Sequence, residues 1–169
     1  SEVAFSAMVG TLKETISLVQ PQSAEIWATA RRLVEEYAAS PNLDLSFQDF
    51  ERETNDLSGE YGAPMGAFLV AQENGRPIGC VGLRKFADGV GEIKRLYVIS
   101  GARGCGVGRA LAEAIIASAK QVGYRRLVLD TLSSMENARS LYLSLGFRPI
   151  APYRFNPVPG TVYLGLEID

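Results

Sequence analysis

Three glycines at alternate positions are the feature of this 169-residue chain that most directly suggests chemistry. They lie in the segment Arg103-Gly-Cys-Gly-Val-Gly108, just before a long amphipathic stretch. Glycine adopts positive φ angles without strain, so this spacing allows several backbone N–H groups to line one concave nest. A helix that starts there adds its unpaired N–H groups and the positive end of its dipole. The segment therefore predicts a diphosphate site, to which Arg103 and Arg109 could add charged contacts.

The spacing of the glycines distinguishes among the phosphate-binding patterns. A P-loop needs G-x-x-x-x-G-K-[ST], and no Lys-Ser or Lys-Thr pair follows these glycines. A dinucleotide-binding fingerprint needs G-x-G-x-x-G, which would put Arg109 at the third glycine. Asp130, however, lies about 20 residues further on, where a ribose-binding acid is expected. An NAD-type nucleotide-binding module therefore stays open as an alternative. A second alternative is that the glycines only form a tight turn between a strand and a helix.

The composition limits the chemistry that is possible. The chain contains no histidine, which excludes a Ser-His-Asp or Cys-His nucleophile and any His-ligated metal. Cys80 and Cys105 have no metal-ligand spacing, so we expect no metal and a reduced, cytoplasmic setting. A net charge of −2 without a basic tract argues against a nucleic-acid partner. No apolar run approaches the roughly 20 residues that span a membrane.

The elements that must position these residues fit one α/β domain over residues 1–169, without linkers or repeats. In the N-terminal part, residues 1–65, we expect a strand over 11–19 and a helix from Gln20 to Ala38. A second helix is expected behind an N-cap at Ser46.

Residues 66–168 alternate short apolar runs with turn signals. The Asn74-Gly75 and Asp88-Gly89 pairs predict tight turns, and thus an antiparallel meander, before a strand-helix-strand unit. We expect strands over 67–71, 77–86, 92–99, 126–131, 147–153 and 162–168, and helices over 106–122 and from a Ser133–Glu136 capping box to Leu145.

The Gly-rich segment matches the pattern [QR]-x-x-G-x-[GA] through Arg103, Gly106 and Gly108. The segment from Asn137 to Phe147 follows it with Asn-Ala-x-x-Leu-Tyr-x-x-x-Gly-Phe. With both in this order, the chain closely resembles the GNAT (Gcn5-related N-acetyltransferase) superfamily over roughly residues 66–168. Ser100, where many members have proline, and Cys105, often a larger or charged residue, depart from the family pattern without removing a backbone donor.

The resemblance implies the GNAT fold, a mixed, mostly antiparallel sheet of six to seven strands with a central splayed parallel pair and about four flanking helices. It also implies acetyl-CoA as acyl donor, lying between the strands 92–99 and 126–131, with pantetheine paired to the open edge of the first. The residues implied to bind it are Tyr97, Val98, Arg103, Gly104, Cys105, Gly106, Val107, Gly108, Arg109 and Asn137.

The resemblance further implies direct attack of a neutral amine on the thioester in a ternary complex, without an acyl-enzyme. The Leu96 N–H would stabilise the oxyanion of the tetrahedral intermediate. Tyr142 would protonate the departing thiolate, although a tyrosine on this apolar helix stripe would otherwise be core packing. Glu92 stands where some members carry a catalytic base acting through water, and strand alternation would put it on one face with Lys94, Leu96 and Val98. The alternative is that Glu92 only caps an exposed strand end near Lys94 and takes no part in catalysis.

The acceptor is expected to be a small-molecule or peptide amine, and polyamine, amino acid, aminoglycoside and peptide N-terminus all stay open. The segment from Asp44 to Glu60 contains six acidic residues and only one arginine. They predict either an acidic rim for a cationic amine or a solvated helix face. Closing strands in the family often pair between subunits, so a homodimer is possible. The alternative function is a non-catalytic module that binds CoA or a nucleotide.

Overall fold

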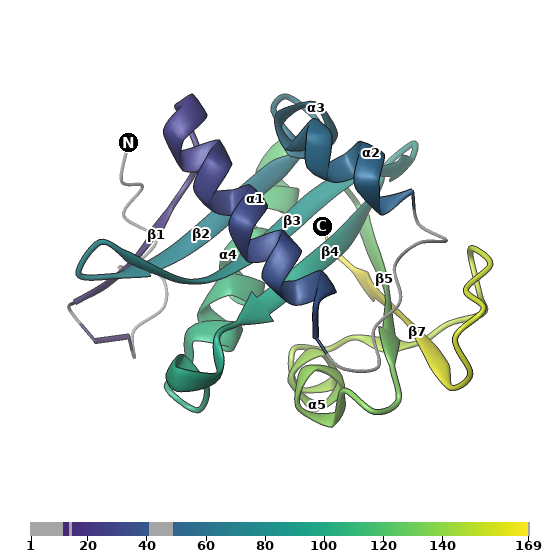
Figure 1. Ribbon diagram of the computed structural model, residues 1–169. Helices are drawn as coiled ribbons and strands as arrows, with labels where there is room; N and C mark the ends of the chain where they lie inside the picture. Colours follow the sequence, from purple (N-terminus) through teal and green to yellow (C-terminus); the bar gives the residue numbers. More distant parts are fainter. Residues whose placement is uncertain (1–11, 14, 41–48, 169) are drawn as a thin grey trace.

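The computed structural model describes residues 12–13, 15–40 and 49–168, and in this part of the chain seven strands form one sheet in the order β1-β2-β3-β4-β5-β7-β6 (Figure 1). The strands are β1 (Ile16–Val19), β2 (Ala67–Glu73), β3 (Arg76–Ala87), β4 (Val90–Val98), β5 (Arg126–Leu132), β6 (Arg148–Pro149) and β7 (Thr161–Glu167). The helices are α1 (Ala24–Ala38), α2 (Phe50–Asn55), α3 (Leu57–Tyr61), α4 (Val107–Val122) and α5 (Glu136–Ser144), with a 3-10 turn η3 (Ser100–Ala102). None of these helices has the length and hydropathy needed to cross a membrane.

Helices cover both faces of the sheet. Figure 1 shows α1, α2 and α3 in front of the sheet and α4 behind it. The core divides accordingly: Leu111 and Ile115 of α4 belong to one buried cluster, and Leu33 of α1 and Tyr61 of α3 belong to the other. The middle strands are buried on both sides, which explains why β2 and β3 read as nearly continuous apolar runs.

The N-terminal helices begin and break at side-chain caps that differ from the predicted positions. α1 starts after Ser23, whose Oγ accepts a hydrogen bond from the Ile26 N–H at 3.3 Å, and not at Gln20. The single helix predicted behind Ser46 is wrong in its described part, because Asp56 leaves helical geometry and separates α2 from α3. The Asp56 carboxylate caps the new helix through the Gly59 N–H at 3.2 Å. Ser46 itself lies outside the described residues.

The predicted meander is confirmed, since β2, β3 and β4 pair antiparallel in chain order. Asn74 and Gly75 both have positive φ angles, 51° and 80°, as a tight hairpin turn requires. Gly89 makes the second turn at φ 75°.

Two predictions for the C-terminal part are wrong. α5 starts at Glu136 after Met135, and Ser133 makes no cap; its N–H donates to the Gly160 carbonyl instead. The strand expected over 147–153 is only Arg148–Pro149, because the chain beyond turns inward and carries Tyr153 to a buried carboxylate of β4.

The β4–β5 pair is parallel and short. It is in register only from Val90 to Glu92 against Arg126 to Val128. Beyond these residues the strands continue without pairing to each other, and Figure 1 shows them diverging toward the end where α5 lies. The predicted fold, a mixed sheet with a splayed parallel pair, is thereby confirmed, with five α-helices in the described residues against the four expected.

Candidate active site

The open edge of β4 presents backbone groups to the gap that forms where β4 and β5 diverge. The Ile99 N–H donates to the Ile78 carbonyl of β3 at 2.9 Å, so by alternation the N–H and C=O of Val98 point to the opposite edge. Arg103 Nε reaches that Val98 carbonyl at 3.0 Å, which agrees with this direction. Tyr97 differs, because its side chain lies against α1 and donates to Glu36 at 3.3 Å.

The Gly-rich segment forms an exposed loop between η3 and α4. Gly104 and Gly106 have φ angles of 83° and 79°, in the left-handed region that glycine tolerates. A Cβ atom at either position would meet no atom within 4 Å, so the space in front of the loop is open. Gly106 is the N-cap of α4 and provides no side-chain cap for the N–H groups that follow. Loop and helix together fit the diphosphate of a CoA ester.

The charged and polar side chains predicted for the cofactor surround this loop. Arg109 forms an ion pair with Glu113 at 2.8 Å and donates to Ser144 Oγ at 3.1 Å, which ties the start of α4 to the end of α5. Cys105 is exposed within the loop, and Asn137 is exposed in the first turn of α5. The structure thus places the predicted residues from Arg103 to Arg109 in one loop at the start of α4 and Asn137 on α5, which Arg109 ties to α4, whereas the side chain of Tyr97 points to α1.

Tyr142 lies on the α5 side of the gap with only 4% of its surface exposed. Its ring packs edge-on against Phe147 at 5.3 Å between centroids. Burial, and secondarily the nearby Tyr37 phenol, raise the pKa of Tyr142 well above its usual value, and no described residue forms a hydrogen bond with its hydroxyl. The phenol is therefore protonated at neutral pH and can donate a proton.

A β-bulge in the middle of β4 overturns one prediction. The register with β3 shifts because β4 carries an extra residue at Arg95, whose φ angle is 62°. The extra residue reverses the alternation of the side chains: Leu96 and Val98 pack in the cluster under α4, whereas Glu92 and Lys94 face the α1–α3 side. The prediction that these four side chains share one face is wrong.

Glu92 lies where the two strands begin to diverge, and its side chain is fully buried. One carboxylate oxygen accepts hydrogen bonds from Arg84 Nε at 3.1 Å and Arg154 Nη2 at 3.0 Å. The other accepts from the Tyr153 hydroxyl at 2.7 Å, and Lys94 Nζ lies 3.9 Å away. Glu92 is thus enclosed by donors, on the face of the sheet opposite to the Leu96 side chain.

Lys94 and Asp130 bridge the strands beyond their last backbone pairing. Lys94 Nζ lies 3.1 Å from Asp130 Oδ1, and each side chain is 3% exposed. Asn156 donates to the second Asp130 oxygen at 3.2 Å. Burial opposes the charge of both groups and lowers the pKa of Lys94; for Asp130 the neighbouring ammonium and the hydrogen bonds outweigh burial and lower its pKa. A carboxylate occupied in this way is not placed as the ribose-binding acid of a nucleotide site.

The acidic segment divides in the described residues: Asp49, Glu51 and Asp56 are exposed, as on a solvated face, whereas Glu53 and Glu60 are paired with arginines, and the acidic rim stays a prediction. Glu53, 1% exposed, pairs with Arg95 through two hydrogen bonds of 2.8 and 2.9 Å. Burial raises the pKa of Glu53, but Arg95 and Arg84 outweigh it and leave this pKa lowered. Glu60 lies 3.3 Å from Arg84 and 3.2 Å from Arg52. Asp44 lies outside the described residues.

Sequence reasoning missed the loop that follows β6. Tyr153, Arg154 and Asn156 all donate to the buried carboxylates of β4 and β5. Their partners lie 61, 62 and 26 residues away, so no local spacing relates them.

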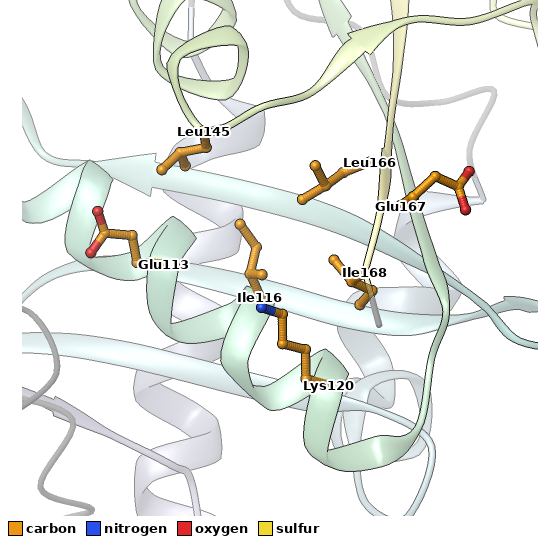
Figure 2. Close-up of a pocket in the computed structure, with 7 residues that line it drawn as sticks. All are labelled: Glu113, Ile116, Lys120, Leu145, Leu166, Glu167 and Ile168. Atoms are coloured by element: carbon orange, nitrogen blue, oxygen red, sulfur yellow. The ribbon is translucent and has the colours of Figure 1, made fainter.

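A separate groove lies between α4 and β7, with a volume of about 430 Å³. Figure 2 shows Ile116, Leu145, Leu166 and Ile168 around the hollow, while Glu167 points away from it. None of the predicted donor-binding or catalytic residues lines this groove.

Comparison with known proteins agrees with this geometry. The model of the acetyltransferase (GNAT) family matches residues 27–147. An uncharacterized N-acetyltransferase of Schizosaccharomyces pombe is 41% identical over 141 residues, which cover 82% of this chain and 86% of that protein. An acetyltransferase structure from Streptococcus agalactiae has a TM-score of 0.76 at 19% identity, covering 92% of this chain and 100% of that one. The yncA structure from Salmonella typhimurium, which contains acetyl-CoA, has a TM-score of 0.63 at 23% identity, covering 92% and 95%.

The fold and the family match together define an acyl-CoA-dependent N-acyltransferase. The chain belongs to the acetyltransferase (GNAT) family.

Proposed function

We propose that this protein transfers an acetyl group from acetyl-CoA to a primary amine, by direct attack of the neutral amine in a ternary complex. The observation that carries the proposal is the gap between β4 and β5, which pair from Val90 to Glu92 only and then diverge beside the glycine nest. An open strand edge can pair with the amide-containing pantetheine arm as an added strand would. The acetyl-CoA in the Salmonella typhimurium structure supports the same donor.

In this proposal the donor is held mainly by backbone groups. Val98 pairs with the pantetheine arm, and the N–H groups from Gly104 to Arg109 bind the diphosphate, with Arg103 and Asn137 at its sides. Leu96 has no Cα partner in the register of β3 or β5, which supports its N–H as the donor to the developing oxyanion. Tyr142 protonates the departing thiolate, a role supported by its place in the Asn-to-Phe pattern of α5 and by a hydroxyl that bonds no described residue.

Removal of a proton from the incoming ammonium is the remaining step. Glu92 as its acceptor through water stays a prediction. Both oxygens of its carboxylate already accept hydrogen bonds from Arg84, Arg154 and Tyr153. We therefore favour a structural task for Glu92, which joins the loop after β6 to β4, and release of the proton to solvent water.

The acceptor is proposed to approach from the α1–α3 side. The buried charges on this side are neutralised in pairs, Glu53 with Arg95 and Asp130 with Lys94 among them. Among the described residues, these buried pairs leave no surplus negative charge to select a polycation, so we expect monoamines such as amino acids to be better acceptors than polyamines.

The test is thiol release from acetyl-CoA across an amine panel, with wild type and Tyr142→Phe. Loss of the hydroxyl should lower kcat about 100-fold, the usual size of a general-acid contribution, and leave KM for acetyl-CoA within about twofold. Tyr124→Phe is the matched control. The Tyr124 hydroxyl donates a hydrogen bond of 2.6 Å to the Met65 carbonyl and is not among the predicted site residues. An unchanged kcat in Tyr142→Phe would remove Tyr142 from the mechanism. Binding of acetyl-CoA without turnover by the wild type would instead indicate a CoA-binding sensor.

A further inference from the structure

The bulge in β4 places a non-glycine residue in a conformation that side chains normally avoid. Arg95 has a φ angle of 62° inside a strand, whereas bulges with a left-handed residue usually have glycine there. The bulge turns the Leu96 side chain onto the α4 side of the sheet and leaves Leu96 without a Cα partner in β3. Whatever holds Arg95 in this conformation also fixes the direction of the Leu96 N–H.

The side chain of Arg95 is held at three points. Its Nε and Nη2 donate to the two Glu53 oxygens at 2.8 and 2.9 Å, and both side chains are at most 2% exposed. The Arg95 guanidinium also lies over the Phe50 ring, 5.4 Å from its centroid. On the backbone, the Cys80 thiol donates to the Arg95 carbonyl at 3.4 Å. A two-pronged pair of this kind fixes orientation as well as distance.

We propose that Glu53 of α2 is a positioning residue for acyl transfer, acting through Arg95 to hold the β4 bulge and thereby the Leu96 N–H. This inference rests on the proposed function, because it assumes that the Leu96 N–H stabilises the oxyanion. Glu53 touches neither the glycine nest nor Val98, so its effect is confined to the chemical step. Substrate affinity for acetyl-CoA should not depend on it.

The test is the kinetics of Glu53→Gln, which keeps the shape of the side chain and removes its charge. We expect kcat to fall at least about tenfold, less than the roughly 100- to 1,000-fold that follows complete loss of an oxyanion donor, with KM for acetyl-CoA within about twofold. Glu60→Gln is the matched control: Glu60 pairs with Arg84 and Arg52 in the same network but makes no ion pair with Arg95, and kcat should stay within about twofold.

A rescue variant separates positioning from general loss of structure. Glycine adopts the φ angle of Arg95 without strain, so Arg95→Gly in the Glu53→Gln background should retain the bulge without the ion pair and restore most of kcat. A damaged α2 or a lost acceptor contact would not be repaired by glycine at this position. If Glu53→Gln fails to fold, Phe50→Leu weakens the same support more mildly, and kcat should fall about threefold.

The outcomes are distinct. An inactive wild type would overturn the proposed function itself. An active wild type with unchanged kcat in Glu53→Gln, or no rescue by Arg95→Gly, would overturn the positioning role and leave the function standing. A lowered kcat that glycine restores, with KM for acetyl-CoA unchanged, supports it.

Discussion

The salt bridge between Lys94 and Asp130 takes the place of backbone pairing where β4 and β5 diverge. Removal of one partner leaves the other charge buried, which typically costs 3–5 kcal/mol. We therefore predict that Lys94→Met lowers the free energy of unfolding by about 3 kcal/mol at pH 7. Urea denaturation measures this difference directly.

The same variant should respond to pH in the opposite direction from wild type. In wild type the folded-state pKa of Asp130 is lowered, so its contribution to stability is present above the unfolded pKa of about 4 and lost on acidification. Without the Lys94 ammonium, burial should raise the folded-state pKa above the unfolded value, and stability then increases as the pH falls through it. The difference in the free energy of unfolding between wild type and Lys94→Met should therefore become smaller on acidification.

Two variants control this prediction. Lys85→Met removes an exposed pair with Asp88 and should change the free energy of unfolding by less than about 0.5 kcal/mol. The double variant Lys94→Met/Asp130→Leu replaces the buried pair by apolar groups and should regain most of the lost stability. Equal stability of Lys94→Met and wild type would show that the bridge contributes nothing.

At this scale the sequence predicted the residues whose role depends on local conformation. The left-handed φ angles of Gly104 and Gly106 are ones that their residue type permits, and the Asn-to-Phe pattern predicted Tyr142 as the general acid, a role that stays a prediction. The partnership of Glu53 with Arg95 could not be predicted, because it joins residues 42 positions apart and depends on a bulge. Neither a propensity nor a periodicity signals an extra residue in one strand.

Among the elements, the loop between η3 and α4 should be sensitive to its glycines only where φ is left-handed. Gly106→Ala places a Cβ on a residue with φ 79°, which costs about 1–2 kcal/mol unless the loop moves. Movement of the loop redirects its N–H groups, so KM for acetyl-CoA should rise about tenfold with kcat nearly unchanged. Steady-state kinetics with saturating amine measures both.

Gly101→Ala is the matched control for the loop. Gly101 lies in η3, a Cβ there meets no atom within 4 Å, and its φ is outside the left-handed region. Its KM for acetyl-CoA should equal that of wild type, and a similar increase in both variants would contradict the nest.

Element existence followed from the sequence more reliably than element boundaries. The meander and α4 were predicted because their hydrophobic periods and turn glycines agree. The break at Asp56 and the late start of α5 were not, because each is decided by a competing contact: Asp56 caps Gly59, and the Ser133 N–H bonds Gly160. The β4 face assignment failed for a similar reason, since alternation holds only without a bulge.

For the whole molecule, ligand-linked stability distinguishes CoA binding from dinucleotide binding. A ligand at 100 times its Kd adds about 2.7 kcal/mol to the free energy of unfolding. For a domain of this size that corresponds to a rise in Tm of roughly 5–10 °C. We predict this rise with acetyl-CoA and CoA, and none with NAD or ATP, in a thermal-shift panel. A rise with NAD alone would contradict the proposed donor.

The nest beside α4 is made of main-chain amides, which every amino acid possesses, whereas the α1–α3 side depends on named side chains from several distant segments. Mutational drift therefore acts on the two sides unequally. If the proposed sites are correct, descendants of such a chain can exchange the amine they modify through a few replacements near α2 or the loop after β6, while binding of the thioester survives. A directed-evolution library for new acceptors is best confined to those segments.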